Sequence, residues 1–141
     1  MNPFVNPEKR SVLLPAGCKD LADVLRLPTR EAGDPVQVFI RLMLLRAEGA
    51  RATEILIEAP MVHEAECIIT QRINGRFHHV STIQARFRSG VVGELLRMAG
   101  LPQSQFPATG IATLELKRRQ LKWKLQIDGA DTDCRLMQSD E

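Results

Sequence analysis

The segment Asp34–Val80, with the sequence DPVQVFIRLMLLRAEGARATEILIEAPMVHEAECIITQRINGRFHHV, decides the predicted fold of this chain. It reads as a helix that ends near a glycine, a short strand, and a β-hairpin whose turn is Asn74-Gly75. Asn-Gly between two runs of β-forming residues is the strongest short-range hairpin signal, because both turn residues must adopt a positive φ. The segment therefore predicts helix, strand and hairpin, in that order.

A mostly buried helix is predicted over residues 34–48. Asp34 is a favourable N-cap, and Pro35 suits the first helical position, where no amide donor is needed. Apolar residues cover nearly the whole circumference, which is typical of a helix that lies across a sheet. A thin polar stripe includes Gln37, Arg41 and Glu48. Gly49 is expected to end the helix in the left-handed conformation.

Strands are predicted on both sides of the Asn-Gly turn. Apolar and polar residues alternate over residues 54–58, which is the pattern of a half-buried strand. The hairpin strands are predicted over residues 66–73 and 76–81. With a two-residue turn between them, Ile69 is expected to face Val80.

A second helix and a second hairpin complete the pattern. The helix is predicted over residues 86–99, and Gly90 and Gly93 within it suggest that another element packs closely there. The hairpin joins a strand around residues 112–116 to one over Leu121–Ile127, where apolar and polar residues alternate strictly.

The two ends of the chain are predicted to lie outside the central domain. Residues 1–33 contain four prolines and read as an N-terminal arm with one short amphipathic helix near residues 19–27. The apolar face of that helix would hold Leu21, Val24 and Leu25, and we expect this face to pack on the chain's own domain, with docking on a partner as the alternative. Residues 129–141 are polar and acidic and are predicted to form a flexible tail. Residues 34–128 then make an α+β domain of about five mostly antiparallel strands, with helices packed on one face.

Composition limits the classes of function. The chain has 141 residues, 44% of them hydrophobic and 26% charged, which is an ordinary balance for one globular domain. The formal net charge of +2 gives no general attraction to nucleic acid. No apolar run approaches the roughly 20 residues that cross a bilayer, and the first residues lack the pattern of a secretory signal. We therefore expect a cytoplasmic protein without a membrane span.

The sequence contains no recognisable catalytic or metal-binding pattern. Its three cysteines are far apart, so neither a disulfide framework nor a paired-cysteine zinc site is expected. The stretch His63-Glu64-Ala65-Glu66-Cys67 approaches a zinc-binding H-E-x-x-H motif but lacks the second histidine. No glycine-rich phosphate-binding motif is present. We therefore expect no catalytic residues, no metal and no cofactor, and we do not expect an enzyme.

The densest charge cluster lies at the tip and on the outer face of the last hairpin. It consists of Lys117, Arg118, Arg119, Lys122 and Lys124. Such a cluster binds phosphate groups in some proteins. Lysines on a hairpin are more often solvated side chains that protect an edge from aggregation. The nearly neutral net charge favours this second interpretation, and weak nucleic-acid binding stays an alternative.

Four short segments occur in an order found in one family: Gly49-Ala50 at the end of a helix, Glu54–Pro60, Arg72–Phe77 and Leu95–Leu101. They resemble the N-terminal half of the motor unit in the ATPases of type II secretion and type IV pilus assembly. In that family a helix ending in Gly-Ala precedes Asp-Ile-His-Ile-Glu-Pro, followed by an Arg-x-Arg-x-Asp-Gly hairpin and a helix with Lys-x-Met-Ala-Gly-Leu-Asp. The resemblance covers residues 34–127, about two thirds of the 141 residues, and implies a PAS-like α+β fold.

The resemblance does not extend to the catalytic half of the family. The RecA-like half, which carries the phosphate loop and the metal-binding acids, has no counterpart among these residues. In the hairpin, Thr70 stands where the family has its first arginine, and Arg72 matches the second. Asn74 replaces the aspartate before the glycine. Since the family arginines reach nucleotide held by a neighbouring subunit, the resemblance implies nucleotide contact through Arg72 and a partner subunit only.

The favoured hypothesis is a non-catalytic protein-interaction domain, an accessory or regulatory subunit that binds a motor ATPase or a second copy of itself. Its contact surface would be a sheet face together with the hairpin residues Arg72, Asn74, Gly75, Arg76 and Phe77. One alternative is a PAS-like sensor that binds a small apolar or nucleotide ligand between sheet and helix. Another is a weak nucleic-acid binder that uses the basic hairpin 117–124.

Overall fold

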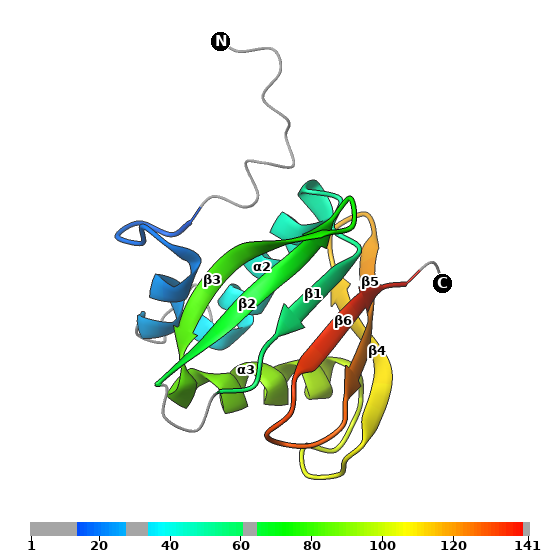
Figure 1. Cartoon of the computed structure of the whole chain (residues 1–141). Coiled ribbons are helices and arrows are strands. Elements are labelled where there is room, and N and C mark those ends of the chain that lie inside the picture. The colour runs from blue at the N-terminus through cyan, green and yellow to red at the C-terminus, as the bar shows by residue number, and fades with distance from the viewer. Residues whose placement is uncertain (1–13, 28–33, 61–64, 140–141) are drawn as a thin grey trace.

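The computed structural model of the chain describes residues 14–27, 34–60 and 65–139. Most of the predicted N-terminal arm, His63-Glu64 and the last two residues of the predicted tail lie outside these ranges. The described helices and strands, shown in Figure 1, are η1 (Leu21–Arg26), α2 (Pro35–Gly49), β1 (Glu54–Ile57), β2 (Glu66–Ile73), β3 (Arg76–Gln84), α3 (Ala85–Met98), β4 (Ala108–Glu115), β5 (Gln120–Ile127) and β6 (Cys134–Gln138).

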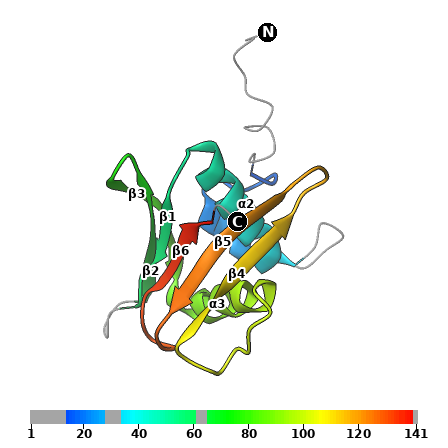
Figure 2. The ribbon, with the colours of Figure 1, turned by 90° about the vertical axis from the view of Figure 1, so that its right-hand side faces the viewer.

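The six described strands form one antiparallel sheet in the order β3-β2-β1-β6-β5-β4. The sheet consists of two three-stranded meanders, β1–β2–β3 and β4–β5–β6, which meet where β1 pairs with β6. Helices α2 and α3 lie on the same face of the sheet, as Figures 1 and 2 show from two directions. The α+β class was predicted correctly, whereas the described residues form a sheet of six strands and not about five.

The additional strand is β6, which occupies a central position in the sheet. The prediction that residues 129–141 form a flexible tail is therefore wrong for residues 134–138. Cys134 and Leu136 are fully buried, and β6 pairs with β1 on one side and with β5 on the other. Only two alternating apolar residues mark this strand within a polar stretch, so its pairing with two distant neighbours places it here. The domain extends beyond residue 128 to at least Gln138.

The predicted N-terminal helix belongs to the hydrophobic core. It is a 3₁₀-helix, η1, and it packs against α2 and β3. Its three predicted apolar-face residues are buried: Leu21, Val24 and Leu25. The Asp23 carboxylate accepts hydrogen bonds from the backbone amides of Asp20 and Lys19, and these bonds lower the pKa of Asp23. The predicted arm is therefore not separate from the domain over this segment.

Helix α2 begins as predicted and ends differently. The amide of Val36 donates a hydrogen bond of 2.8 Å to the Asp34 carboxylate, and Pro35 is the first helical residue. At the other end Gly49 remains helical, and the residue with a left-handed φ is Arg51, at 58°. The prediction of a left-handed glycine is thus wrong, because the last turn continues before the chain reverses.

The first hairpin has the predicted turn but a shifted register. The Asn-Gly turn has a positive φ at both residues, 52° and 81°, as this turn requires. A β-bulge then shifts the pairing, so that Ile69 faces Ser81 and not the predicted Val80. The shift lets Ile83, further along β3, point into the core, where it is 1% exposed. The bulge therefore aligns the apolar residues of β3 with those of β2.

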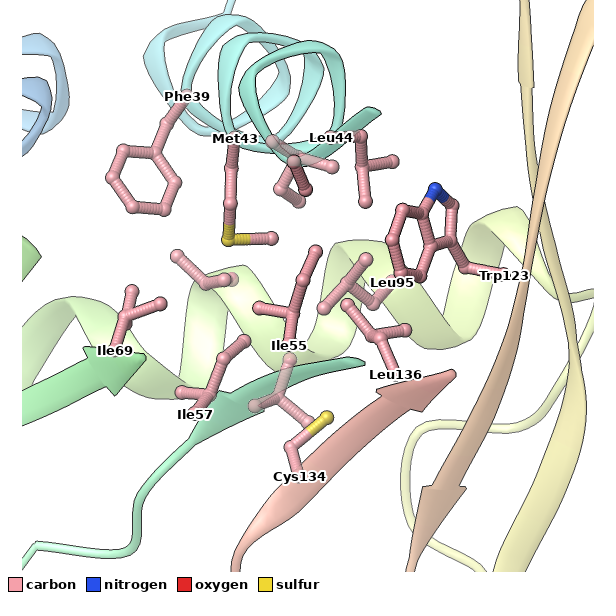
Figure 3. Close-up of a cluster of buried hydrophobic side chains, with 14 of the residues drawn as sticks. Phe39, Met43, Leu44, Ile55, Ile57, Ile69, Leu95, Trp123, Cys134 and Leu136 are labelled. Carbon is pink, nitrogen blue, oxygen red and sulfur yellow. The ribbon is translucent and has the colours of Figure 1, made fainter. Parts of the chain in front are cut away.

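The hydrophobic core lies between α2, α3 and the inner face of the sheet (Figure 3). Trp123 of β5 is 1% exposed and packs in this layer with Phe39 and Met43 of α2 and Leu95 of α3. The two helices thus bury one face of the sheet along most of its width. Within the described ranges, no helix has both the length and the apolarity to cross a bilayer.

Close packing at a glycine occurs in β4 rather than in α3. A Cβ added at Gly90 would meet Val36 at 3.7 Å, and one added at Gly93 would meet the Gln103 side chain at 3.5 Å. Another element therefore does lie at both positions, but at ordinary contact distances that would also accommodate an alanine. A Cβ at Gly110 would meet the Leu101 side chain at 2.9 Å. The connection after α3 therefore packs directly on the β4 backbone.

Candidate functional site

The sheet face opposite α2 and α3 is not covered by any described helix or strand, and we call it the open face (Figures 1 and 2). Residues that pair across strands share a face, so their side chains form rows that cross the sheet. One row contains Phe77, Arg72, Glu54, Met137, Lys124 and Ile111. The next contains His79, Thr70, Leu56, Arg135, Gln126 and Thr109.

Two large apolar side chains are exposed on the open face. Phe77 is 51% exposed and Ile68 is 39% exposed, and these are the exposed large hydrophobic residues of the described ranges. Leu56 and Met137, which lie on the same face, are half-buried. Apolar side chains gathered on one uncovered face are a feature of protein-binding surfaces. The open face is therefore the candidate interaction surface.

Glu54 lies between two arginines near the centre of the open face. Arg135 Nε is 2.6 Å from Glu54 Oε1, and Arg72 Nη1 is 3.9 Å from Glu54 Oε2. The Arg72 guanidinium also lies over the Phe77 ring, 5.6 Å from its centroid. The Glu54 side chain is 12% exposed, whereas those of Arg72 and Arg135 are 47% and 51% exposed. The cluster therefore presents positive charge to solvent beside an exposed aromatic ring.

The structure brings together two of the five hairpin residues named from the sequence. Arg72 and Phe77 pair across the strands and share the open face. Asn74 and Gly75 form the turn, and both are exposed. Arg76, next to Phe77 in the strand, lies on the opposite face. The candidate surface thus contains the hairpin only through Arg72 and Phe77.

The predicted basic cluster is divided between two places. Arg119 forms an ion pair with Glu48 at the end of α2, which attaches the β4–β5 turn to that helix. Lys122 and Lys124 of β5 lie on the open face. The turn carries the remaining two cations: Lys117 and Arg118. The cluster therefore does not form one patch, and the open face gains two of its positive charges.

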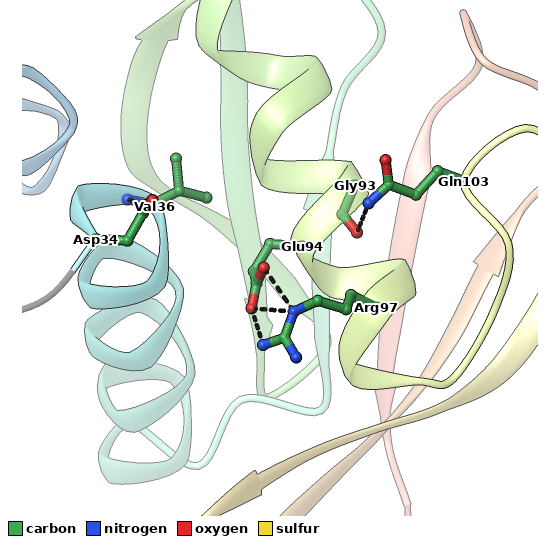
Figure 4. Close-up of polar contacts among 6 residues, drawn as sticks. All are labelled: Asp34, Val36, Gly93, Glu94, Arg97 and Gln103. Atoms are coloured by element: carbon green, nitrogen blue, oxygen red, sulfur yellow. Dashed lines mark hydrogen bonds and ion pairs between the residues drawn. The ribbon is translucent and has the colours of Figure 1, made fainter.

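A cavity of about 350 Å³ opens on the helix side of the sheet, between α2, α3 and β4. Its apolar lining comes from Val38, Ile40, Met98 and Leu114, and its charged lining comes from Arg41, Glu94 and Arg97. Glu94 accepts hydrogen bonds from Arg97 Nε at 2.9 and 3.0 Å (Figure 4), and this contact raises the pKa of Arg97. Arg41 is exposed and makes no ion pair with another described residue.

A buried arginine joins the two meanders. Arg88 of α3 is 4% exposed and donates hydrogen bonds to three backbone carbonyls. One belongs to Glu58, just after β1, at 3.0 Å, and the other two belong to Ala130 and Thr132, just before β6. Because its donors are used within the fold, Arg88 has a structural role.

The cysteines offer no activated thiol. Burial raises the pKa of Cys134 to about 12, with the nearby Arg88 charge lowering it less. Burial also raises the pKa of Cys67, and burial together with the Asp23 charge raises that of Cys18. A thiol with a raised pKa is a poor nucleophile at neutral pH. Among the residues that the structure describes, no group of three potential ligands is placed to hold a metal ion.

Three important residues were not identified from the sequence. Glu54 alternates with Ile55 along its strand, so side-chain alternation could have placed it on the face away from the core. Arg88 lies one helical turn before Val91, on the buried stripe of α3, so helical periodicity could have found it. Arg135 had no local signal, because its strand was predicted to be a tail.

Comparison of the chain with protein-family models and with curated proteins gives no match.

Proposed function

We propose that this chain is a non-catalytic protein-interaction domain that binds a partner through its open face. The observation that carries this proposal is the exposure of Phe77 and Ile68 on a sheet face that no described helix covers. Apolar contact supplies affinity in protein interfaces, while charges around it supply orientation and specificity. Arg72 and Phe77 are the proposed anchors, since arginine and aromatic residues dominate binding energy at such surfaces.

The charges of the open face favour an acidic partner. Arg72, Arg135 and two lysines of β5 face solvent there, and Glu54 is already paired with both arginines. A partner with carboxylates around an apolar centre would complement this surface. The resemblance to the N-terminal half of secretion and pilus-assembly ATPases, together with the PAS-like relationship it implies, supports a motor ATPase as that partner.

A pull-down with matched variants tests the proposal. The tagged protein and its Phe77→Glu and Arg135→Glu variants are used as bait in lysate from native cells. We expect the wild type to recover a motor ATPase, and the two variants to recover at least about tenfold less of it, because a central contact is lost. Arg26→Glu, an exposed arginine of η1, is the matched charge-reversal control. Purified ATPase should then bind the wild type and Arg26→Glu more tightly than it binds Phe77→Glu and Arg135→Glu.

Equal recovery of the ATPase by all four baits would show that the open face is not the contact surface. Recovery of no ATPase by any of them would remove the proposed partner. Sedimentation of the purified protein over a range of concentrations separates the second possibility, self-association through the same face, from binding to another protein.

A small-ligand sensor is the second candidate, and the cavity between α2, α3 and β4 favours it. Its volume of about 350 Å³ lies at the lower end of the range of ligand sites. A thermal-shift screen of nucleotides and metabolites tests this function. A ligand present at 100 times its dissociation constant should stabilise the protein by about 2.7 kcal/mol. An unchanged melting temperature across the screen would rule this candidate out.

A further inference from the structure

The second surface of interest is the free edge of β4. This strand pairs with β5 only, so its other side carries backbone groups that no described strand satisfies. The amide of Leu116 donates to the Arg119 carbonyl, which identifies this pair as hydrogen-bonded. Hydrogen-bonded and non-hydrogen-bonded pairs alternate in antiparallel strands. The residues whose amides and carbonyls point outward are therefore Thr109, Ile111, Thr113 and Glu115.

The β4 edge lacks the features that usually prevent strand addition. It pairs with β5 over eight residues without a register shift and contains no proline, lysine or arginine. Its single charged residue is Glu115, at the end of the strand. The other edge strand, β3, has a bulge and packs beside η1. Of the two edge strands, β4 is therefore the one that can pair with another strand.

The cavity between α2, α3 and β4 lies directly beside this edge. Thr113, whose backbone groups point outward, lines the cavity together with Leu114. In a strand added to β4, alternate side chains would point toward the helix side of the sheet. There they would meet the apolar lining from Ile40 and Met98 and the charge of Arg41, which pairs with no carboxylate of the described residues. The β4 edge thus offers hydrogen bonds to the backbone of an added strand, and the cavity offers contacts to its side chains.

We infer that β4 binds an extended peptide segment of a partner protein by strand addition. One apolar side chain of the segment enters the cavity, and one carboxylate pairs with Arg41. Such binding combines main-chain hydrogen bonds for affinity with side-chain pockets for specificity. The inference goes beyond the proposed open-face function and does not depend on it, because the open-face anchors Arg72 and Phe77 lie on β2 and β3, whereas β4 is the opposite edge of the sheet.

A second copy of this chain fits the edge less well than an acidic peptide. In an antiparallel β4–β4 pair the helices of both copies would lie on the same side of the joined sheet, bringing Arg41 of each copy, which lines the cavity beside β4, toward the junction. Like charges at an interface oppose association. The helix-side residues of β4 are also small apart from Leu114, so they would leave the cavity unfilled: Ala108, Gly110 and Ala112.

Selection from a phage-displayed library of random octapeptides tests the inference. The immobilised full chain should enrich sequences with alternating β-branched residues and an Asp or Glu. A synthetic peptide of the most enriched sequence is then titrated while backbone amide signals are recorded by NMR. We expect the amides of Ile111 and Thr113 to shift and to become protected from hydrogen exchange, because they gain partners. Amides of β3 should not change.

Three variants connect the binding to the named residues. Arg41→Glu should weaken binding of the peptide about tenfold or more by placing a like charge opposite its carboxylate. Thr113→Pro removes an outward amide without removing a bond to β5, so it should abolish binding, provided that circular dichroism shows a folded protein. Phe77→Glu on the open face should leave peptide binding unchanged. This last variant separates failure of the inference from failure of the proposed function.

Several results would overturn the inference. These are the absence of any enriched sequence, equal peptide binding by wild type and Arg41→Glu, and peptide-induced shifts that map to β2 and β3 and not to β4. If the Ile111 amide becomes protected from hydrogen exchange without peptide as the protein concentration rises, the edge binds a second copy of the chain instead.

Discussion

The two meanders, β1–β2–β3 and β4–β5–β6, are built alike but end in different edges. The outer strand of the first, β3, is bulged and lies beside η1. The outer strand of the second, β4, is regular and uncharged up to Glu115. A bulge and a neighbouring helix hinder strand addition, whereas a regular, uncharged edge favours it. The comparison indicates that the fold shields one edge and leaves the other accessible.

The meanders also contribute different residues to the junction between β1 and β6. The first provides β1, with Glu54 on the open face, and the second provides β6, with Arg135 paired to that carboxylate. On the helix side, Arg88 binds carbonyls from both meanders.

The largest effect is expected from Leu136→Ala in β6. Leu136 is fully buried, and its truncation leaves a cavity at the junction of the two meanders. We expect a loss of about 3 kcal/mol in the free energy of unfolding, measured by urea denaturation. Met137→Ala, on the half-buried open face of the same strand, is the control and should lose about 1 kcal/mol or less. Equal losses would mean that β6 is not a central core strand.

Replacement of Arg88 by methionine tests the polar connection between the meanders. The change keeps the side chain long but leaves three backbone carbonyls without their donor, which should destabilise the protein by about 2–4 kcal/mol. Arg86→Met is the matched control on the same helix, at an exposed position, and should cost less than about 1 kcal/mol. Hydrogen exchange should show faster opening of β6 in the Arg88 variant. A stability equal to that of the wild type would contradict the role given to Arg88.

Gly75→Ala tests the turn of the first meander. Gly75 has a φ of 81°, which an alanine adopts only with strain, so we expect a loss of about 1–2 kcal/mol. Gly49→Ala is the control, because Gly49 is helical with nothing within 4 Å of an added Cβ. It should be neutral or stabilise the protein by up to about 1 kcal/mol. Thermal or urea unfolding measures both, and a larger loss at Gly49 would contradict this interpretation.

The smallest effect at neutral pH is expected from the Cys134 thiol. Burial raises its pKa in the folded protein from an ordinary 9.0 to about 12. The folded state therefore holds this proton more tightly than the unfolded state, and stability falls as the pH rises from about 9 toward 12. Cys134→Ala should show a shallower alkaline loss in urea unfolding at several pH values. Identical slopes for variant and wild type would refute this contribution.

Much of the fold follows from local signals in the sequence. The start of α2, the strands of the first hairpin and the alternation in β5 were all predicted correctly. The register of that hairpin was not, because the bulge forms where β3 must match both β2 and the core. The candidate site was found only in part. Arg72 and Phe77 were named, whereas Arg135 was missed because its strand is defined by its neighbours.

By itself, the sequence determined the local elements: the helix start at Asp34-Pro35, the Asn-Gly turn and the two-residue period of the strands. Capping, turn geometry and side-chain alternation depend on residues that are close in the chain. Only the tertiary structure decided the central place of β6, the burial of Arg88 and the grouping of Glu54, Arg72 and Arg135. These features depend on contacts between residues far apart in the chain, which a local pattern does not specify.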